Sequence, residues 1–357
     1  MSGTSLDAID VVIAQRTEQG LKQVAGIAPA MPDVLRQQLL RICTDKKVDL
    51  QTLGEVDHLF ALTCADVVNQ LLKKANIDAS QITAIGSHGQ TIFHSPLTKM
   101  PFTQQIGDSN LIAAKTAIPC ISDFRRMDMA YGGQGAPLVP AFHQALFSKE
   151  GEQRVILNIG GIANISILSS NDSVLGYDTG PGNILMDAWI EKCLGKSYDK
   201  DGDLAAQGQV IPALLEKLLA DNYFSLSAPK STGREKFNLA WLETHLSLFQ
   251  LRNEDIQRTL LELSAVTIAD QIKHHGRNAA VFVCGGGALN PLLMQRLQQL
   301  LTNHQVSDTN DLNIDPMFVE AIAFAWLAEQ RLLQKPIRLK SVTGATKDAI
   351  LGCLYLP

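Results

Sequence analysis

The sequence GYDTGPGN, residues 176–183, places one carboxylate between an expected strand and an expected helix. The preceding VLGY has the β-branched and aromatic character of a strand end, and the run GPG predicts a tight turn. Asn183 is a candidate N-cap for the next helix, whose free N–H groups and positive dipole end suit phosphate or a developing oxyanion. Asp178 is therefore a candidate catalytic group. The alternative is an incidental aspartate in a strand–turn–helix connection.

Length and composition narrow the class of protein. The 357 residues, 46% of them hydrophobic, suffice for two domains, because single cores seldom grow past roughly 250–300 residues. The formal charge of −5, without any Lys/Arg run, argues against a nucleic-acid partner. Six scattered cysteines without a CxxC pair indicate reduced thiols. No stretch reaches the roughly 20 apolar residues that span a bilayer. We expect a soluble cytoplasmic protein with no membrane partner.

Two further glycine-rich segments are candidate phosphate loops. At the start, Gly3, Thr4 and Ser5 form a polar turn before the expected strand IDVVIA. Such a turn can wrap phosphate with backbone N–H groups, and Asp7 can hold magnesium through water. A disordered N-terminus is the alternative.

In the second half, NIGGIAN separates two β-rich runs and predicts a hairpin bend, with a later turn at Ser170 to Ser173. Its likeness to the SGTS turn suggests two glycine loops facing one another across a cleft. Further on, an apolar strand, Gly285 to Gly287 and a helix let a base or a phosphate lie against bare backbone. The triplet lacks the GxGxxG spacing of a dinucleotide fold.

Four charged or titratable side chains are candidates for contacting a substrate. His88 lies in SHGQT, after an expected buried strand, where α/β proteins bind ligands; a hydrogen-bonded loop histidine is the alternative. Arg125 and Arg126 end another strand, and arginine forks suit carboxylate or phosphate. Glu320, on an apolar helical turn, is either a dipole-stabilised helix start or a substrate contact.

The polar segment SAPKSTGREKFNLAWL, with Lys230, Arg234 and Glu235, predicts either a substrate-covering loop or plain surface, and its spacing does not decide between them. The glycine-rich run from Gly132 to Pro137 predicts a shaped loop leading into the second lobe. A plain interdomain linker is the alternative.

Ten ordered motifs, spread almost end to end, strongly resemble the anhydro-N-acetylmuramic acid kinase family: MSGTSLDAID, SHGQT, GDSNLIA, SDFRRMD, GGQGAPLVPAFH, NIGGIANIS, GYDTGPGN, STGRE, CGGGALN and VEAIAFAWLA. The resemblance implies an α/β fold of the sugar kinase, Hsp70 and actin superfamily, with two ribonuclease-H-like lobes flanking a nucleotide cleft. The implied lobes are 1–140 and 141–357, with the extreme C-terminus able to dock back on the first.

Family members open 1,6-anhydro-N-acetylmuramic acid with water and transfer the ATP γ-phosphate to O6, giving N-acetylmuramate 6-phosphate in cell-wall recycling. The resemblance implies ATP and Mg²⁺ as cofactors, a small amino sugar as partner, and a homodimer. It makes Asp178 the general base. It also implies that the sugar is oriented by His88, Arg125 or Arg126, and Glu320. Its implied ATP-binding residues are Gly3, Thr4, Ser5, Leu6, Asp7, Ala8, Ile9, Asp10, Asn158, Gly160, Gly161, Gly285, Gly286 and Gly287.

One feature departs from the family pattern. Members usually carry an apolar strand before MSGTS, so we expect a chain that begins at Met1 to lack the opening strand of its first lobe and to leave ladder groups unpaired there. Two other functions share these loops: an actin-like or Hsp70-like nucleotide switch, and a kinase for an ordinary free sugar.

Overall fold

The computed structural model describes residues 1–357 except 4–5, 19, 169–173, 229 and 247–250. The chain divides into unit 1, Met1–Leu146 with Phe318–Pro357, and unit 2, Phe147–Met317. This division differs from the predicted lobes 1–140 and 141–357, because residues 318–357 pack with the N-terminal part. Each unit combines sheets with covering helices, so the predicted α/β class is confirmed. The turn predicted at 170–173 lies outside the described residues.

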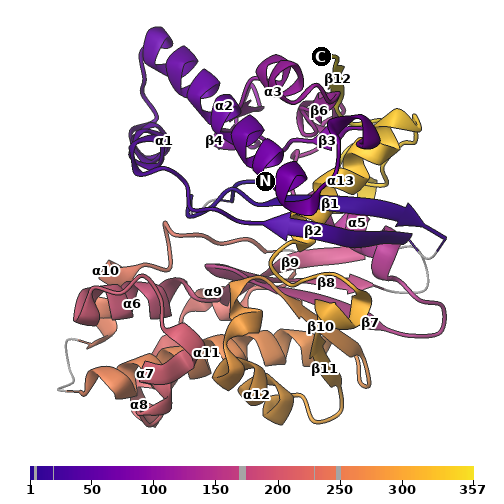
Figure 1. Cartoon of the computed structure of the whole chain (residues 1–357). Helices are drawn as coiled ribbons and strands as arrows, with labels where there is room; N and C mark the ends of the chain where they lie inside the picture. Colours follow the sequence, from indigo (N-terminus) through magenta and orange to yellow (C-terminus); the bar gives the residue numbers. More distant parts are fainter. Residues whose placement is uncertain (4–5, 19, 169–173, 229, 247–250) are drawn as a thin grey trace. The chain divides into compact units, whose positions relative to one another are not determined.

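Unit 1 combines small sheets with helices, of which α2 is the longest (Figure 1). Its elements are β1 (Val11–Thr17), β2 (Gly20–Ile27), α1 (Asp33–Asp45), α2 (Leu50–Ala75), η1 (Ala79–Gln81), β3 (Ile85–Gly86), β4 (Gln90–Ser95), β5 (Phe102–Ile106), α3 (Ser109–Thr116), β6 (Cys120–Ser122), α4 (Arg126–Ala130), α5 (Val139–Phe147, at the boundary), α13 (Val319–Leu332), α14 (Lys340–Thr343) and β12 (Cys353–Tyr355). The described strands form three sheets: the antiparallel pairs β1–β2 and β4–β5, and the sheet β12–β6–β3.

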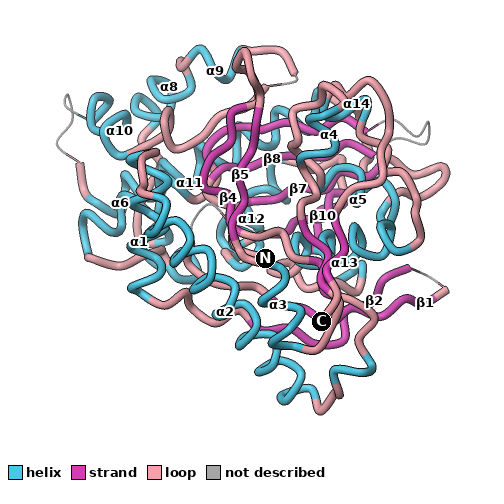
Figure 2. The backbone as a smooth tube through the Cα atoms, turned by 90° about the horizontal axis from the view of Figure 1, so that it is seen from above, coloured by secondary structure: helices cyan, strands magenta, loops and turns pink. Residues whose placement is uncertain are grey.

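The long helix α2 organises the core of unit 1. Asp49 caps it by accepting a hydrogen bond from the Thr52 N–H at 2.9 Å, and Val56 and Phe60 on its buried face are 1% exposed. Helix α3 lies beside α2 in both views (Figures 1 and 2). These apolar contacts hold the strands whose ends carry the candidate substrate residues.

The sheet β1–β2 and the sheet β12–β6–β3 of unit 1 are not joined by a ladder of described residues. Among the described residues, β1 pairs with β2 and β3 pairs with β6, and no ladder connects β1 to β3. A cavity of about 120 Å³ is lined by residues 9–14, by residues 84–87 and by side chains of α2. In the described part of unit 1, this cavity therefore lies between β1 and the segment that contains β3.

Unit 2 is one five-stranded sheet with helices (Figure 1). Its elements are β7 (Arg154–Ile159), β8 (Ile162–Leu168), β9 (Val174–Pro181), α6 (Ile184–Leu194), η2 (Lys200–Gly202), α7 (Asp203–Ala206), α8 (Pro212–Leu219), α9 (Asn222–Ser225), α10 (Leu239–Leu246), α11 (Asn253–His274), β10 (Ala280–Cys284), η3 (Gly286–Leu289), α12 (Pro291–Leu300), β11 (Gln305–Asp308) and η4 (Thr309–Leu312).

The strand order of unit 2 is β9–β8–β7–β10–β11, with β7, β10 and β11 parallel and β8 antiparallel to both of its neighbours. This is the 3-2-1-4-5 order of a ribonuclease-H-like lobe. Alternate residues of β7, including Val155 and Leu157, share one core with α11 and α12. The carboxyl ends of β7 and β10 therefore lie side by side at one end of the sheet. Ligands of α/β proteins bind at this end of parallel strands.

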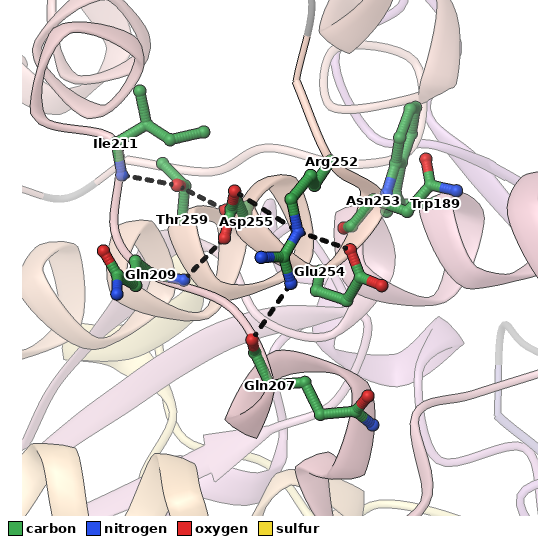
Figure 3. Close-up of polar contacts among 9 residues, drawn as sticks. All are labelled: Trp189, Gln207, Gln209, Ile211, Arg252, Asn253, Glu254, Asp255 and Thr259. Atoms are coloured by element: carbon green, nitrogen blue, oxygen red, sulfur yellow. Dashed lines mark hydrogen bonds and ion pairs between the residues drawn. The ribbon is translucent and has the colours of Figure 1, made fainter.

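The N-terminal turn of α11 is tied to its neighbours by polar contacts (Figure 3). The Asp255 carboxylate accepts a hydrogen bond from the Gln209 N–H at 2.8 Å, and the Thr259 hydroxyl accepts one from the Ile211 N–H at 3.0 Å. The Trp189 indole donates to the Asn253 carbonyl at 3.1 Å. These bonds fix the helix that backs the sheet.

Among the described residues no helix combines the length and the apolar content needed to cross a bilayer. All six cysteines are free, as expected from their spacing. Cys120 and Cys284 are buried, whereas Cys353 is exposed.

Candidate functional site

Asp178 lies within a strand rather than in the turn after it. Strand β9 runs through Pro181, and Asp178 pairs with Asn164 of β8. The register of the two strands shifts between Ala163 and Asn164, because Ala163 already pairs with Gly180. This irregularity leaves Thr179 as the extra residue and aims the neighbouring side chains differently from a regular ladder. The predicted strand end at Tyr177 was therefore four residues too early.

The start of α6 confirms the predicted cap position but not its predicted chemistry. Asn183 is the N-cap, yet its side chain makes no capping bond and its Nδ2 donates to the Ile159 carbonyl at 3.3 Å. The Gly182 and Ile184 N–H groups donate to the Gly161 carbonyl at 2.8 and 3.0 Å. The N–H groups of Asn183, the N-cap, and of Ile184, the first residue of α6, are thus used by the bend after β7, because that bend lies directly against them.

The bend and the glycine triplet meet at the same edge of the unit 2 sheet. A Cβ on Gly285 would lie 2.5 Å from the Asn158 Oδ1, and one on Gly287 would lie 2.5 Å from the Ile159 Cβ. Gly285 also has φ of 78°, which side chains seldom adopt. Both glycines are therefore required by packing and backbone conformation.

Three other glycines in these two loops are less tightly packed against the rest of the protein. The nearest atom to a Cβ on Gly160, Gly161 or Gly286 would be 3.6–3.7 Å away, which is ordinary contact. No backbone acceptor among the described residues takes the N–H of Gly160 or Gly161. Bare backbone with free donors at the end of parallel strands is suited to phosphate.

This difference predicts which glycine the fold needs. We expect Gly287→Ala to lower the free energy of unfolding by about 1–3 kcal/mol, because its methyl would overlap the buried, stiff side chain of Ile159. Gly286→Ala is the matched control and should leave that free energy nearly unchanged. Urea denaturation followed by circular dichroism measures both. Equal loss in the two variants would contradict the distinction.

Asp178 is half-buried and tightly held. Its Oδ2 accepts hydrogen bonds from the Ser231 hydroxyl and from the Thr232 N–H, both at 3.0 Å. Burial raises the pKa of the Asp178 carboxyl, the bonds from Thr232 and Ser231 oppose this, and the nearby Glu235 raises it further. The net pKa is above the ordinary value, which suits a proton acceptor.

The backbone of Asp178 is fixed from the same side. Its N–H donates to the Lys230 carbonyl at 3.0 Å, and its carbonyl accepts the Tyr223 hydroxyl at 2.7 Å. Sequence reasoning missed these partners, since Ser231 and Thr232 are more than 50 residues from Asp178. The only signal was the polar, glycine-broken composition of the segment around them.

In unit 1 the structure brings three of the predicted substrate residues together. Arg125 donates from Nε and Nη2 to His88 Nε2 at 3.1 and 2.9 Å and from Nη1 to the Gly135 carbonyl at 2.8 Å. The buried His88 ring lies 4.7 Å from the Phe324 ring. Burial and the Arg125 charge lower the pKa of His88 well below its usual value, so the imidazole is neutral and accepts the guanidinium N–H.

Glu320 completes this group from the first turn of α13. Burial and the charge of Asp10 raise the pKa of Glu320, while Arg125 lowers it. Burial also lowers the pKa of Arg125 to about 10, with Glu320 opposing. His88, which is buried, and the half-buried Arg125, Glu320 and Asp10 therefore form one polar cluster, which we call the unit 1 cluster.

Arg126 lies outside the unit 1 cluster. Its side chain is 65% exposed and pairs with Asp123 at 2.7 Å. The adjacent arginines point to different surroundings because one precedes α4 and the other begins it. The structure thus separates two residues that the sequence could not rank.

The N-terminal turn is described only in part. Thr4 and Ser5 lie outside the described residues. Leu6 and Ile9 are 2% and 1% exposed and belong to the core, so only their backbone is available to a ligand. Asp7 has an exposed carboxylate, 3.7 Å from Arg36. Gly3 and Ala8 contribute to the turn through backbone alone, with Ala8 bridging to Ala30.

Comparison with known proteins decides the family. The model of the family described as anhydro-N-acetylmuramic acid kinase matches residues 1–357. This chain belongs to that family. A relative named anhydro-N-acetylmuramic acid kinase from Vibrio vulnificus strain YJ016 is 51% identical over 357 residues, covering 99% of this chain and 96% of the relative. One of the same name from Pasteurella multocida is 52% identical, covering 99% and 95%. The anhydro-N-acetylmuramic acid kinase family assignment makes the chain a kinase that uses ATP.

Similarity to solved structures is weak. The activator of the 2-hydroxyisocaproyl-CoA dehydratase from Clostridium difficile, with bound ADPNP, is 13% identical and covers 92% of this chain and 99% of that one, with a TM-score of 0.41. The fold of each unit therefore rests on its own strand order.

Proposed function

We propose that the protein opens 1,6-anhydro-N-acetylmuramic acid with water and phosphorylates O6, with Asp178 as the general base. The family assignment supports the substrate, because relatives about 50% identical over the whole chain carry that name. The observation that carries the proposal within the chain is the environment of Asp178. Its carboxylate is half-buried and fixed through one oxygen, at the sheet edge that also bears the open glycine backbone.

The reaction requires one proton acceptor. As the water oxygen bonds to C1, Asp178 takes a water proton, the bond from C1 to O6 breaks, and O6 bonds to the γ-phosphorus while the bond to the ADP oxygen breaks. The sugar gains the water oxygen at C1 and the phosphoryl group at O6. A base in this role must come within roughly 3 Å of its water.

Residues at the unit 2 sheet edge fit a nucleotide phosphate. Gly160 and Gly161 offer N–H donors, and Gly286 offers backbone at which an added Cβ would make only ordinary contact. Asn158 lies beside Gly285, which keeps the bend and the triplet adjacent. We assign ATP phosphate and adenosine contacts to this edge, because phosphoryl transfer depends mainly on positioning and charge neutralisation.

Magnesium fits a role through water. Asp7 carries an exposed carboxylate with only a long ion pair to Arg36, so it remains able to reach a hydrated cation. Magnesium bound to nucleotide keeps several waters and needs one or two carboxylates. When bound, the ion screens phosphate charge.

The unit 1 cluster is proposed to orient the sugar. Arg125 provides a cation for the lactyl carboxylate, and Glu320 provides a carboxyl whose raised pKa suits hydrogen bonding to hydroxyl groups. The neutral His88 holds the guanidinium in place.

Incubation with ATP, magnesium and the anhydro sugar in ¹⁸O-labelled water tests the reaction. We expect a 6-phosphorylated product carrying the label at C1, detected by mass spectrometry. Phosphorylation without label would indicate a kinase for a free sugar, and ATP turnover without any sugar product would indicate a nucleotide switch. Either result would overturn the proposal.

We also propose a cytoplasmic homodimer. The six free cysteines, one of them exposed, favour a reducing compartment. The dimer rests on the family resemblance, and sedimentation velocity measures it.

A further inference from the structure

The segment 230–235 was open to two interpretations, a substrate cover or plain surface, and its contacts point to a third. It contains most of the side-chain and backbone partners of Asp178: Lys230, Ser231, Thr232 and Glu235. It is connected to β9 by these contacts alone rather than by a ladder. Its role therefore depends on what it does to that carboxylate.

The segment is anchored firmly at both ends. Lys230 is 8% exposed, and its ammonium donates to the carbonyls of Tyr223 and Phe224 at 3.2 and 3.3 Å. At the other end, the fully buried Phe237 stacks on Phe224 with ring centroids 5.6 Å apart. Tyr223 in turn donates to the Asp178 carbonyl. The segment and α9 thus hold β9 as one assembly.

The contacts distinguish the two oxygens of Asp178. Both hydrogen bonds go to Oδ2, and no hydrogen bond to Oδ1 occurs among the described residues. A carboxylate held at one oxygen keeps its plane fixed while the other oxygen stays available for a proton. Donors to the charged form also favour ionisation.

We propose that Ser231 and Thr232 are positioning residues that fix Asp178 through Oδ2, so that Oδ1 receives the proton. This inference rests on the proposed role of Asp178 as the base. The STGRE motif therefore holds the base instead of covering the substrate.

The charged and titratable groups around Asp178 have separable effects. Ser231 and Thr232 favour the carboxylate, whereas Glu235 disfavours it by like charge. Lys230 directs its ammonium to Tyr223 and Phe224. Burial and the Asp178 charge raise the pKa of Tyr223, so this phenol stays neutral and donates. Neighbours within one segment thus shift the pKa of Asp178 in opposite directions.

Direct titration of Asp178 is the experiment. In protein labelled with ¹³C at aspartate carboxyls, the Asp178 signal is assigned by its absence from Asp178→Asn. Ser231→Ala should raise the Asp178 pKa by about half to one unit, since an exposed hydroxyl competes with water. Ser231→Thr should restore the original value. Glu235→Gln should lower the pKa.

Ser225→Ala is the matched control, because it removes a hydroxyl that donates to the Asn222 carbonyl on neighbouring α9. It should leave the Asp178 titration unchanged. An unchanged or lowered Asp178 pKa in Ser231→Ala would overturn the proposal.

The pH profile of kcat separates this inference from the proposed function. Activity requires ionised Asp178, so it falls as pH drops through the Asp178 pKa. Ser231→Ala should therefore move the acidic limb to higher pH, and Glu235→Gln should move it to lower pH. If the carboxyl titration shifts but the acidic limb does not follow, Asp178 is not the base, and the proposed function fails while the contacts to Oδ2 stand.

Discussion

Asp178→Asn is expected to lower kcat by about 10²–10⁴, because it removes the proposed proton acceptor. Asparagine keeps a carbonyl oxygen that can accept from Ser231 and Thr232, and the backbone bonds of residue 178 are unaffected. The fold and ATP affinity should therefore be retained. Steady-state kinetics, with calorimetric titration of ATP, measure both quantities.

Asp201→Asn is the control for the same chemical change. Asp201 is exposed in η2 and its φ of 57° is well tolerated by asparagine. The kcat of the Asp201→Asn variant should match that of the unmodified protein. Retained turnover in Asp178→Asn would remove this carboxylate from the mechanism.

Arg125→Gln is expected to lower kcat/KM for the anhydro sugar by about 10²–10³, the range for truncating one partner of a hydrogen-bonded charge pair, because it removes the proposed cation for the lactyl carboxylate. The change removes the cation facing Glu320 and the donors to His88 and the Gly135 carbonyl. Thermal unfolding should also shift downward, because Glu320 loses the positive charge of Arg125.

Arg126→Gln provides the adjacent comparison. Its exposed guanidinium contacts Asp123, and surface pairs of this kind contribute little. We expect kcat/KM to stay within about twofold. A loss at position 126 equal to that at position 125 would show that the unit 1 cluster does not orient the sugar.

The sequence predicted features whose signals are local. Glycine and proline marked the bends after β7 and β10, and the ionisable candidates included Arg125, after β6, and Glu320, on the first turn of α13. The predicted bends are confirmed, because turn residues act through their own backbone conformation. The predicted use of the α6 N–H groups does not extend to Ile184, because the Gly161 carbonyl accepts a hydrogen bond from that N–H.

Features set by distant residues were not predicted. Ser231 reaches Asp178 across 53 positions, and nothing in the spacing of STGRE indicates that contact. The ranking of Arg125 over Arg126 depends on burial against His88 and Glu320, which lie 37 positions before and far after it. The resemblance implied that the extreme C-terminus can dock back on the first lobe, but the extent of that return, residues 318–357, depends on tertiary packing.

The packing of residues 318–357 in unit 1 also affects the order in which the two units fold during translation. Residues 147–317 form a contiguous body, whereas unit 1 needs its last 40 residues, 318–357, in place. Until α13 emerges, Arg16 lacks Glu329 and His88 lacks the Phe324 ring. We expect unit 2 to fold first during translation, while the earlier N-terminal part waits incomplete and depends on chaperones.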